Sequence, residues 1–257
     1  MKKLLALLLA LVCVLSIASC GIKNNNNNNN NNGDNPSNKE LLELYAGYLS
    51  VSIPTKSEVT TTVTEGNNVL ISTNTLTTGS ITDNSGSKAA TTLVTKAQTF
   101  NSIETGMLNL VDEKVTEEWY LEGKGVSTNK GRSWKDGTNF AASAGSLQLG
   151  LSEENFTSIT YDKDKGELVL VCSADTAASV IGYYLPGDYD HYYETTVTIS
   201  AFGDKITGIK ISYAIEDRPA GDENDPDASI YVDYTTVEVN AVYEYGLQTI
   251  NLNGYKG

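Results

Sequence analysis

The sequence has 257 residues and a formal net charge of -14, from 18 Lys and Arg against 32 Asp and Glu. This charge disfavours nucleic-acid binding, which depends on Lys and Arg side chains that neutralise phosphates. It also disfavours a tight electrostatic dock on anionic lipid. The length is typical of one large β domain.

The first twenty residues have the order of a secretory signal peptide. Lys2 and Lys3 precede an apolar run over residues 4–15, and small residues lead to Cys20. The run is shorter than the roughly 20 apolar residues that a membrane-spanning helix needs, so cleavage is expected. Residues 17–20, Ile-Ala-Ser-Cys, resemble the lipobox of bacterial lipoproteins, which implies that Cys20 is lipidated and becomes the new N-terminus. The alternative is an ordinary signal peptide with a chance cysteine.

Two acyl chains hold a protein stably at a membrane. We therefore expect the chain in the cell envelope, anchored through Cys20 on the outer side of the cytoplasmic membrane, or on the outer membrane if the host has one. Loss of Lys2 and Lys3 leaves 16 basic against 32 acidic residues, a net charge of -16.

Residues 21–36 are expected to form a disordered tether. They include an unbroken asparagine run over residues 24–32, which has no apolar side chains to bury and so cannot offset the entropy of ordering. A coil of this length reaches about 20 to 25 Å. The alternative is that the asparagine run drives self-association.

Cys172 is the one cysteine left for the domain, because Cys13 leaves with the signal peptide and Cys20 carries lipid. An internal disulfide is then impossible. Cys172 ends an apolar run over residues 167–172, where a free cysteine usually acts as a small buried hydrophobe.

Two helices are predicted. Ser37 and Glu40 have the spacing of a capping box, and apolar side chains follow at helical spacing until Pro54. A second helix is predicted over residues 175–185, with Asp175 as its N-cap.

The rest of the sequence, from Ser57 onward, alternates Thr, Val, Ile and Tyr between turn residues, as antiparallel strands do. Strands are predicted over residues 58–64, 68–78, 90–101, 114–121, 124–127, 132–134, 157–162 and 167–172, and then over the C-terminal third. The predicted fold is α+β: a single domain over residues 37–257 with a large curved antiparallel sheet of about ten strands, a half-barrel, packed over two helices. The alternation predicts one apolar face.

In the C-terminal third, Gly203 and Asp204 are predicted to form a tight turn between two strands. Ile230, Val232 and Tyr234 stand at even positions, so they would face one side of a strand. Val237 and the alternating apolar residues after it stand at odd positions, so they would face the other side. A β-bulge near Thr235 is therefore expected.

Residues 118–125, Glu-Trp-Tyr-Leu-Glu-Gly-Lys-Gly, and 131–135, Gly-Arg-Ser-Trp-Lys, resemble an aromatic hairpin of the LolA/LolB/LppX-like group of envelope lipoproteins. Residues 202–206, 243–246 and 249–251 are similar to the final strands of that group. The resemblance covers about residues 38–257. It implies a half-barrel sheet folded over helices, with an apolar cavity that in several relatives carries acyl chains or a lipidated protein.

The first functional hypothesis is a non-enzymatic envelope lipoprotein whose curved sheet binds an apolar, lipid-like ligand or a lipidated partner. The tryptophans have an alternative role as ordinary core aromatics. The candidate cavity wall consists of Trp119, Trp134, Val197, Ile199, Ile209, Ile211, Tyr213, Val237 and Val239.

The second hypothesis is a surface interaction module that recognises a protein or glycan. Its candidate recognition residues are Tyr189, His191, Tyr192 and Tyr193, since tyrosines supply rigid amphipathic contact area. The alternative for these residues is a plain polar loop.

No catalytic residue, cofactor or metal site is predicted. His191 is the one histidine, which removes any multi-histidine metal site. Glu117 and Glu118 are strand neighbours and point to opposite faces, so they cannot flank one glycosidic bond. The acidic run over residues 222–227 lacks the glycine of an EF-hand loop and is predicted to be a solvated hairpin tip.

Replacing Cys20 by Ser is expected to release the protein from membranes, because the lipid attachment atom is lost. Membrane fractionation of cells that express each form measures this. Unchanged membrane association of C20S would refute the anchor.

Overall fold

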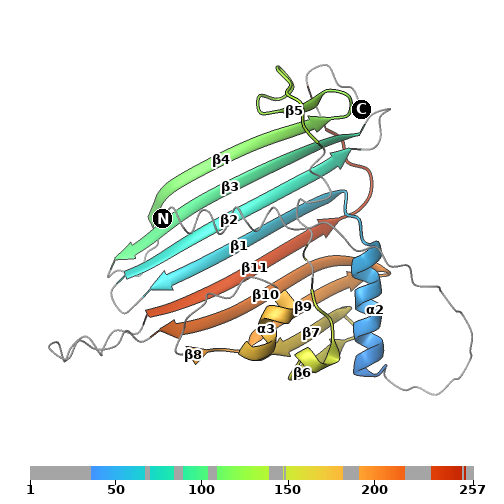
Figure 1. Ribbon diagram of the computed structural model, residues 1–257, viewed down its shortest axis with the longest axis vertical. Coiled ribbons are helices and arrows are strands. Elements are labelled where there is room, and N and C mark those ends of the chain that lie inside the picture. Colours follow the sequence, from blue (N-terminus) through green and yellow to red (C-terminus); the bar gives the residue numbers. More distant parts are fainter. Residues whose placement is uncertain are drawn as a thin grey trace, which may run out of the picture.

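The computed structural model describes residues 36–66, 70–83, 89–103, 109–138, 147, 149–181, 191–217, 233–250 and 252 (Figure 1). The predicted signal peptide, the tether up to residue 35 and the acidic run over residues 222–227 lie outside these residues. The helices and strands, in chain order, are α2 (Asn38–Val51), β1 (Lys56–Gly66), β2 (Leu70–Asp83), β3 (Ala90–Ile103), β4 (Asn109–Leu121), β5 (Gly125–Ser127), the 3₁₀ helix η1 (Glu153–Asn155), β6 (Ser158–Asp162), β7 (Glu167–Cys172), α3 (Ala174–Ile181), β8 (His191–Tyr192), β9 (Thr195–Phe202), β10 (Lys205–Asp217) and β11 (Asp233–Glu244).

The eleven strands of the described residues form one antiparallel sheet. Its order is β5-β4-β3-β2-β1-β11-β10-β9-β7-β6, and β8 pairs with β10 outside this path. The first and last strands along the chain, β1 and β11, meet in the middle of the sheet over eleven residue pairs, from Lys56 opposite Glu244 to Gly66 opposite Tyr234. The predicted α+β class with a curved antiparallel sheet and two helices is confirmed, and the sheet is open at β5 and β6.

Two strand predictions were wrong. Residues 132–134 form no strand, and the chain there makes one isolated bridge, Val126 opposite Lys135. The expected bulge near Thr235 is absent, because β11 pairs without interruption with β10 and β1 at this position. Ile230 and Val232, whose phase suggested the bulge, lie outside the described residues. Within β11, Tyr234 and Val237 lie on opposite sides of the sheet in an uninterrupted ladder.

Helix α2 begins as the sequence predicts. The Ser37 hydroxyl accepts a hydrogen bond from the Glu40 backbone N–H at 3.3 Å, and the Glu40 carboxylate accepts one from the Ser37 N–H at 2.8 Å. These reciprocal bonds satisfy two of the free donors at a helix N-terminus. The hydrogen bonds that the Glu40 carboxylate accepts from the Ser37 N–H and from the Ser37 hydroxyl hold the pKa of this carboxyl below its ordinary value. The helix buries Leu41, Leu42 and Tyr45.

Helix α3 begins earlier than predicted. The Ala177 N–H donates to the Ser173 carbonyl at 2.9 Å, so Ser173 is the N-cap and Asp175 lies within the first turn. Ser173 is also a favoured N-cap residue, two positions before the aspartate. Residues 182–185 of the predicted helix lie outside the described residues.

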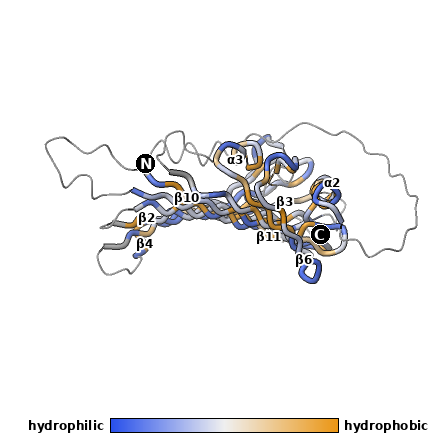
Figure 2. Tube along the Cα trace, turned by 90° about the horizontal axis from the view of Figure 1, so that it is seen from below, coloured by the Kyte–Doolittle hydropathy of each residue, from blue (hydrophilic) through white to orange (hydrophobic). Residues whose placement is uncertain are grey.

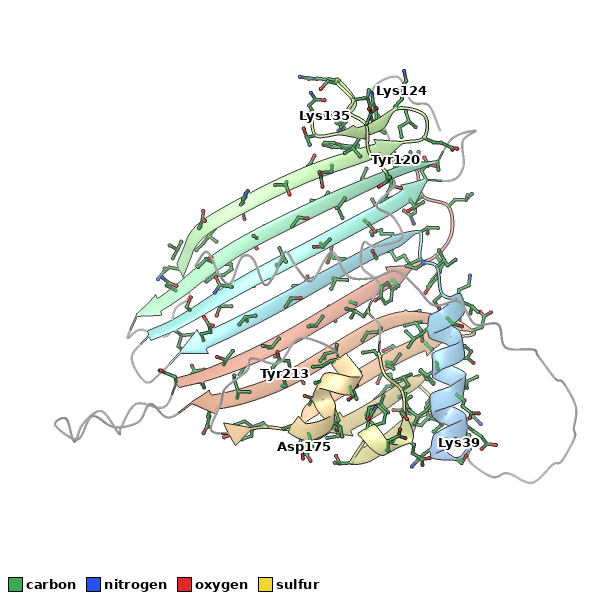
Figure 3. The ribbon with its side chains drawn as sticks, in the orientation of Figure 1. Lys39, Tyr120, Lys124, Lys135, Asp175 and Tyr213 are labelled. Atoms are coloured by element: carbon green, nitrogen blue, oxygen red, sulfur yellow. The ribbon has the colours of Figure 1, made fainter. Side chains whose placement is uncertain are left out.

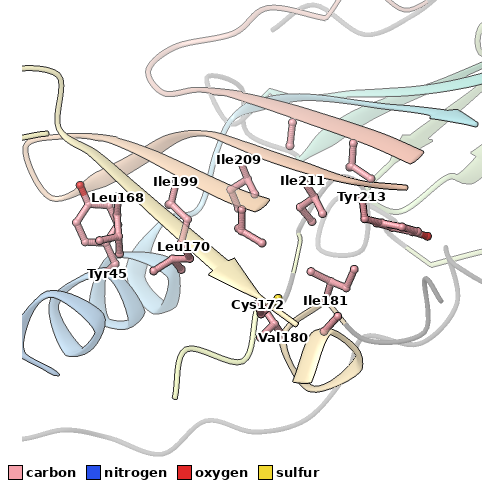
Figure 4. Packing of buried hydrophobic residues seen from close by; sticks show 14 of the residues in the cluster. Tyr45, Leu168, Leu170, Cys172, Val180, Ile181, Ile199, Ile209, Ile211 and Tyr213 are labelled. Atoms are coloured by element: carbon pink, nitrogen blue, oxygen red, sulfur yellow. The ribbon is translucent and has the colours of Figure 1, made fainter. Parts of the chain in front are cut away.

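The main core lies between the two helices and strands β6 to β11 (Figure 4). Alternate residues of each strand point into it, as in β7, where Leu168, Leu170 and Cys172 are buried and their neighbours are only partly buried. Figure 2 shows both helices on the same side of the sheet. The predicted apolar face thus exists, and the helices cover it over one part of the sheet.

A hydrogen bond to the turn between β6 and β7 holds α2 against this core. The Tyr45 hydroxyl donates to the Gly166 carbonyl at 2.8 Å, and burial raises the pKa of Tyr45. Gly166 has a φ of 63°, and a Cβ at this position would lie 2.4 Å from the Ala201 carbonyl oxygen. The close approach of this turn to β9 therefore requires glycine.

Replacing Leu170 by Ala is expected to lower the free energy of unfolding by about 2 to 5 kcal/mol, because a fully buried side chain leaves a cavity. Denaturant unfolding measures the loss. The matched control V169A changes a partly buried neighbour on the other face of β7 and should have a smaller effect. An equal effect of the two variants would contradict the assignment of the faces.

The Cys172 thiol is expected to resist a disulfide reagent at pH 8 in the native protein. It is fully buried, and burial raises its pKa to about 11 from an ordinary value of 9.0. Because the raised pKa favours the neutral thiol in the folded state, this contribution to stability is complete below pH 9 and is lost as the pH rises towards 11. Thiol titration with and without denaturant measures accessibility, and fast native-state labelling would contradict the burial.

Candidate ligand-binding face

The helices do not cover the whole apolar side of the sheet. In Figure 1 both helices overlie the half that contains β6, β7, β9 and β10, and neither overlies β2, β3 or β4. We call the helix-side surface of β1 to β4 the open face. Cross-strand register and the alternation of side chains assign its residues, since directly opposed residues share a face.

Strand β1 joins the core to the open face. Val59 lies opposite Ala241 of β11 and Thr78 of β2, and Val63 lies opposite Val237 and Asn74. Both valines are partly buried and pack against the main core. The apolar surface of the core therefore continues from β11 onto β1.

Strands β2 and β3 continue this surface with half-buried apolar side chains. Leu76 lies opposite Thr61 on one side and Ala97 on the other. Leu93 lies opposite Ser80 and, on β4, Glu118. Leu76, Leu93 and Ala97 are all intermediate in exposure, so they keep apolar area in contact with water.

Hydroxyl and amide groups interleave with these apolar side chains. The Ser57 and Ser80 hydroxyls share a buried hydrogen bond of 2.7 Å. The Thr99 hydroxyl donates to the Asn74 side-chain oxygen at 2.9 Å. A ligand on this face would meet methyl groups and hydroxyls together, which suits an amphipathic molecule better than a pure hydrocarbon.

Charged residues of β4 bound the open face. Asp112 lies opposite Thr99, Lys114 opposite Ala97, and Glu118 opposite Leu93. Asp112 and Lys114 are exposed. The face therefore changes from buried apolar side chains beside β11 to exposed charged side chains at β4.

The opposite side of the same strands has a different surface. Between β1 and β2, three cross-strand threonine pairs bring their hydroxyl oxygens to 3.1 Å (Thr60 and Thr77), 3.5 Å (Thr62 and Thr75) and 3.2 Å (Thr64 and Thr73). Between β3 and β4, the Lys96 ammonium lies 3.2 Å from the Glu113 carboxylate. This polar surface provides a control for any test of the open face, and Figure 3 shows the side chains of these strands as sticks, seen from the side of the helices.

The predicted cavity-wall residues fall into two separate clusters. Seven of them belong to the main core, where they are buried: Val197, Ile199, Ile209, Ile211, Tyr213, Val237 and Val239. Trp119 is buried in a second cluster with Ala90, Leu121, Ile250 and Leu252, and Trp134 is partly buried against it. The structure therefore does not bring the tryptophans together with the other seven residues.

The second cluster lies on the side of the sheet away from the helices. Trp119 is opposite Thr92, and Thr92 is opposite Ile81. Thr92 points to the same side of β3 as the exposed Val94, whereas Leu93 points to the helix side. The C-terminal chain returns to this position, where the Ile250 N–H donates to the Asp83 carboxylate at 2.9 Å. This contact explains how the C-terminal chain helps to bury Trp119.

The predicted recognition residues are described only in part. Tyr189 lies outside the described residues, and the side chains of His191 and Tyr192 are not described. Their backbone pairs with β10, with Tyr192 opposite Ile215 and His191 opposite Glu216. Tyr193 is exposed, and its hydroxyl donates to the Glu216 carboxylate at 2.5 Å.

Sequence reasoning did not single out the apolar residues of the open face. Val59, Val63, Leu76, Leu93 and Ala97 belong to predicted strands, but their alternation is diluted by threonine. The strand order distinguishes them from the core, because it shows which strands lie beyond the helices. Among the described residues, no helix is both long and apolar enough to cross a membrane, and no cluster of three metal-ligating side chains occurs.

Comparison with known proteins gives a distant structural likeness. No protein-family model and no curated protein matches the sequence. The fold is similar to the crystal structure of a DUF1329 family protein from Desulfovibrio piger, with a TM-score of 0.23 and 10% sequence identity, over 82% of this chain and 94% of that chain. The resemblance to the LolA/LolB/LppX-like group therefore stays a prediction.

Proposed function

We propose that this protein is a non-enzymatic lipoprotein of the bacterial cell envelope, anchored through lipidated Cys20, which holds an amphipathic lipid-like ligand on its open face. One observation carries the ligand proposal. The apolar side of the sheet continues beyond the helices, so that Leu76, Leu93 and Ala97 of β2 and β3 remain partly exposed.

The size of the open face supports an elongated ligand. Strands β1 to β4 each contain 11 to 14 residues, and adjacent strands lie about 4.8 Å apart. A ligand that lies across them can contact side chains from three or four strands. An acyl chain would cover the apolar side chains, while a polar head group could reach the hydroxyls and charged groups towards β4.

The anchor proposal depends on the sequence. The lipobox-like Ile-Ala-Ser-Cys ends at Cys20, and the asparagine-rich residues 21–36 separate it from the capping box of α2. The absence of catalysis belongs to the same proposal, because His191 is the one histidine of the chain and the neighbouring Glu117 and Glu118 occupy opposite faces of β4.

Replacing Leu93 by Glu is expected to weaken binding of a fluorescent fatty acid at least about tenfold, because the carboxylate would have to be desolvated beneath the acyl chain. The matched control is V94E, which places the same charge on the next residue of β3, on the other side of the sheet. Titration with cis-parinaric acid measures both affinities, and thermal unfolding checks that both variants fold.

Equal affinities for L93E, V94E and the unchanged protein would place the fatty acid elsewhere. Mass spectrometry after mild purification provides an independent measurement, and co-purifying acyl chains that are reduced in L93E are expected. Failure of both fatty acid and phospholipid to bind the unchanged protein would refute a lipid-like ligand.

A further inference from the structure

The most exposed apolar side chains of the described residues lie outside the open face. Leu247 is 87% exposed, Phe202 84% and Ile53 83%, and Val51 follows at 61%. Single exposed apolar residues are ordinary on protein surfaces, whereas a group of them marks an interaction site. We call these four residues the apolar corner.

Three chain segments meet at this corner. The Ser52 hydroxyl, one residue before Ile53, accepts a hydrogen bond from the Ile206 N–H at 3.0 Å. The Tyr245 hydroxyl, two residues before Leu247, donates to the Ile206 carbonyl at 2.5 Å. Phe202 lies in the same hairpin as Ile206, opposite Lys205. Figure 1 shows the end of α2, the β9–β10 hairpin and the end of β11 at one side of the sheet.

The residues of the corner lie at or beside the ends of helices and strands. Val51 ends α2, and Phe202 ends β9 before Gly203, which has a φ of 64° at the hairpin tip. Lys205 and Tyr245 flank the group, with the ammonium 4.9 Å from the ring centre. Lysine and tyrosine both place an apolar body beside lipid and a polar tip in water, so they suit the membrane interface.

The geometry points to insertion of the apolar corner into the membrane leaflet that carries the Cys20 anchor. This inference depends on the anchoring part of the proposed function. A tether of the length of residues 21–36 is expected to reach about 20 to 25 Å, and α2, with 14 residues, adds about 21 Å between the tether and the corner. The domain can therefore turn this corner towards the bilayer. The net charge of -16 after loss of Lys2 and Lys3 favours apolar contact over attraction to anionic lipid.

The test uses the lipidated mature protein with F202C, labelled with the fluorophore NBD and reconstituted into phosphatidylcholine vesicles. Cys172 is fully buried, so the label should attach selectively at position 202. We expect a blue shift of NBD emission on vesicle binding and quenching by nitroxide-labelled lipid. The matched control is V111C on β4, where the side chain is 60% exposed and emission should stay unchanged.

Adding I53E and L247E to F202C should abolish the blue shift without releasing the anchored protein. An unshifted F202C probe on protein that floats with the vesicles would overturn the inference and leave the anchor intact. If the protein did not float with the vesicles, both the inference and the anchor would be overturned. Equal emission shifts at positions 202 and 111 would also overturn the inference. A blue shift that appears without vesicles and grows with protein concentration would overturn it as well, because it would assign the corner to contact with a second copy of the chain.

Discussion

The fold depends on burial of one apolar face of β7, β9, β10 and β11 beneath α2 and α3. The side chains of Leu168, Leu170, Ile199 and Ile209 are fully buried there, and each such side chain contributes about 1.5 to 3 kcal/mol relative to full exposure. Hydrogen bonds then fix the position of α2 at its middle and at its C-terminal end. Tyr45 binds the β6–β7 turn, and Ser52 binds the first residues of β10.

The length of the helices explains why the cover stops. Helix α2 has 14 residues and is about 21 Å long, while neighbouring strands lie about 4.8 Å apart. A helix of this length that crosses the strands can cover about four of them. Helix α3, with eight residues, is about 12 Å long. The sheet path of ten strands is more than about 40 Å wide, which exceeds the length of either described helix, and neither of these helices overlies β2, β3 or β4 (Figure 1).

Much of this arrangement was predictable from local pattern. The capping box at Ser37 and Glu40, the burial of Cys172 and most strands follow from residue type and spacing. The N-cap of α3 was misplaced because Ser173 and Asp175 are both good caps, and the choice depends on how the chain leaves β7. The pairing of β1 with β11 has no local signal, since it joins residues almost 190 positions apart, such as Lys56 and Glu244. The separation of Trp119 from Ile209 could not be predicted for the same reason, because cluster membership depends on strand order and on where the C-terminal chain returns.

Strands β1 to β4, of which neither described helix overlies β2, β3 or β4, have a further source of stability in their sequence. They form long ladders, including fourteen residue pairs between β2 and β3, so that β1, β2 and β3 pair with a neighbouring strand on both sides over most of their length. Threonine suits this position because its branched side chain favours extended backbone and its hydroxyl can pair across strands. The same side chain leaves a surface that is neither dry nor strongly charged on the helix side, with leucines at Leu76 and Leu93 as its most apolar points. A sheet built in this way can stay folded in water and still present apolar area, which is the physical requirement for a protein that takes up and releases an amphipathic ligand.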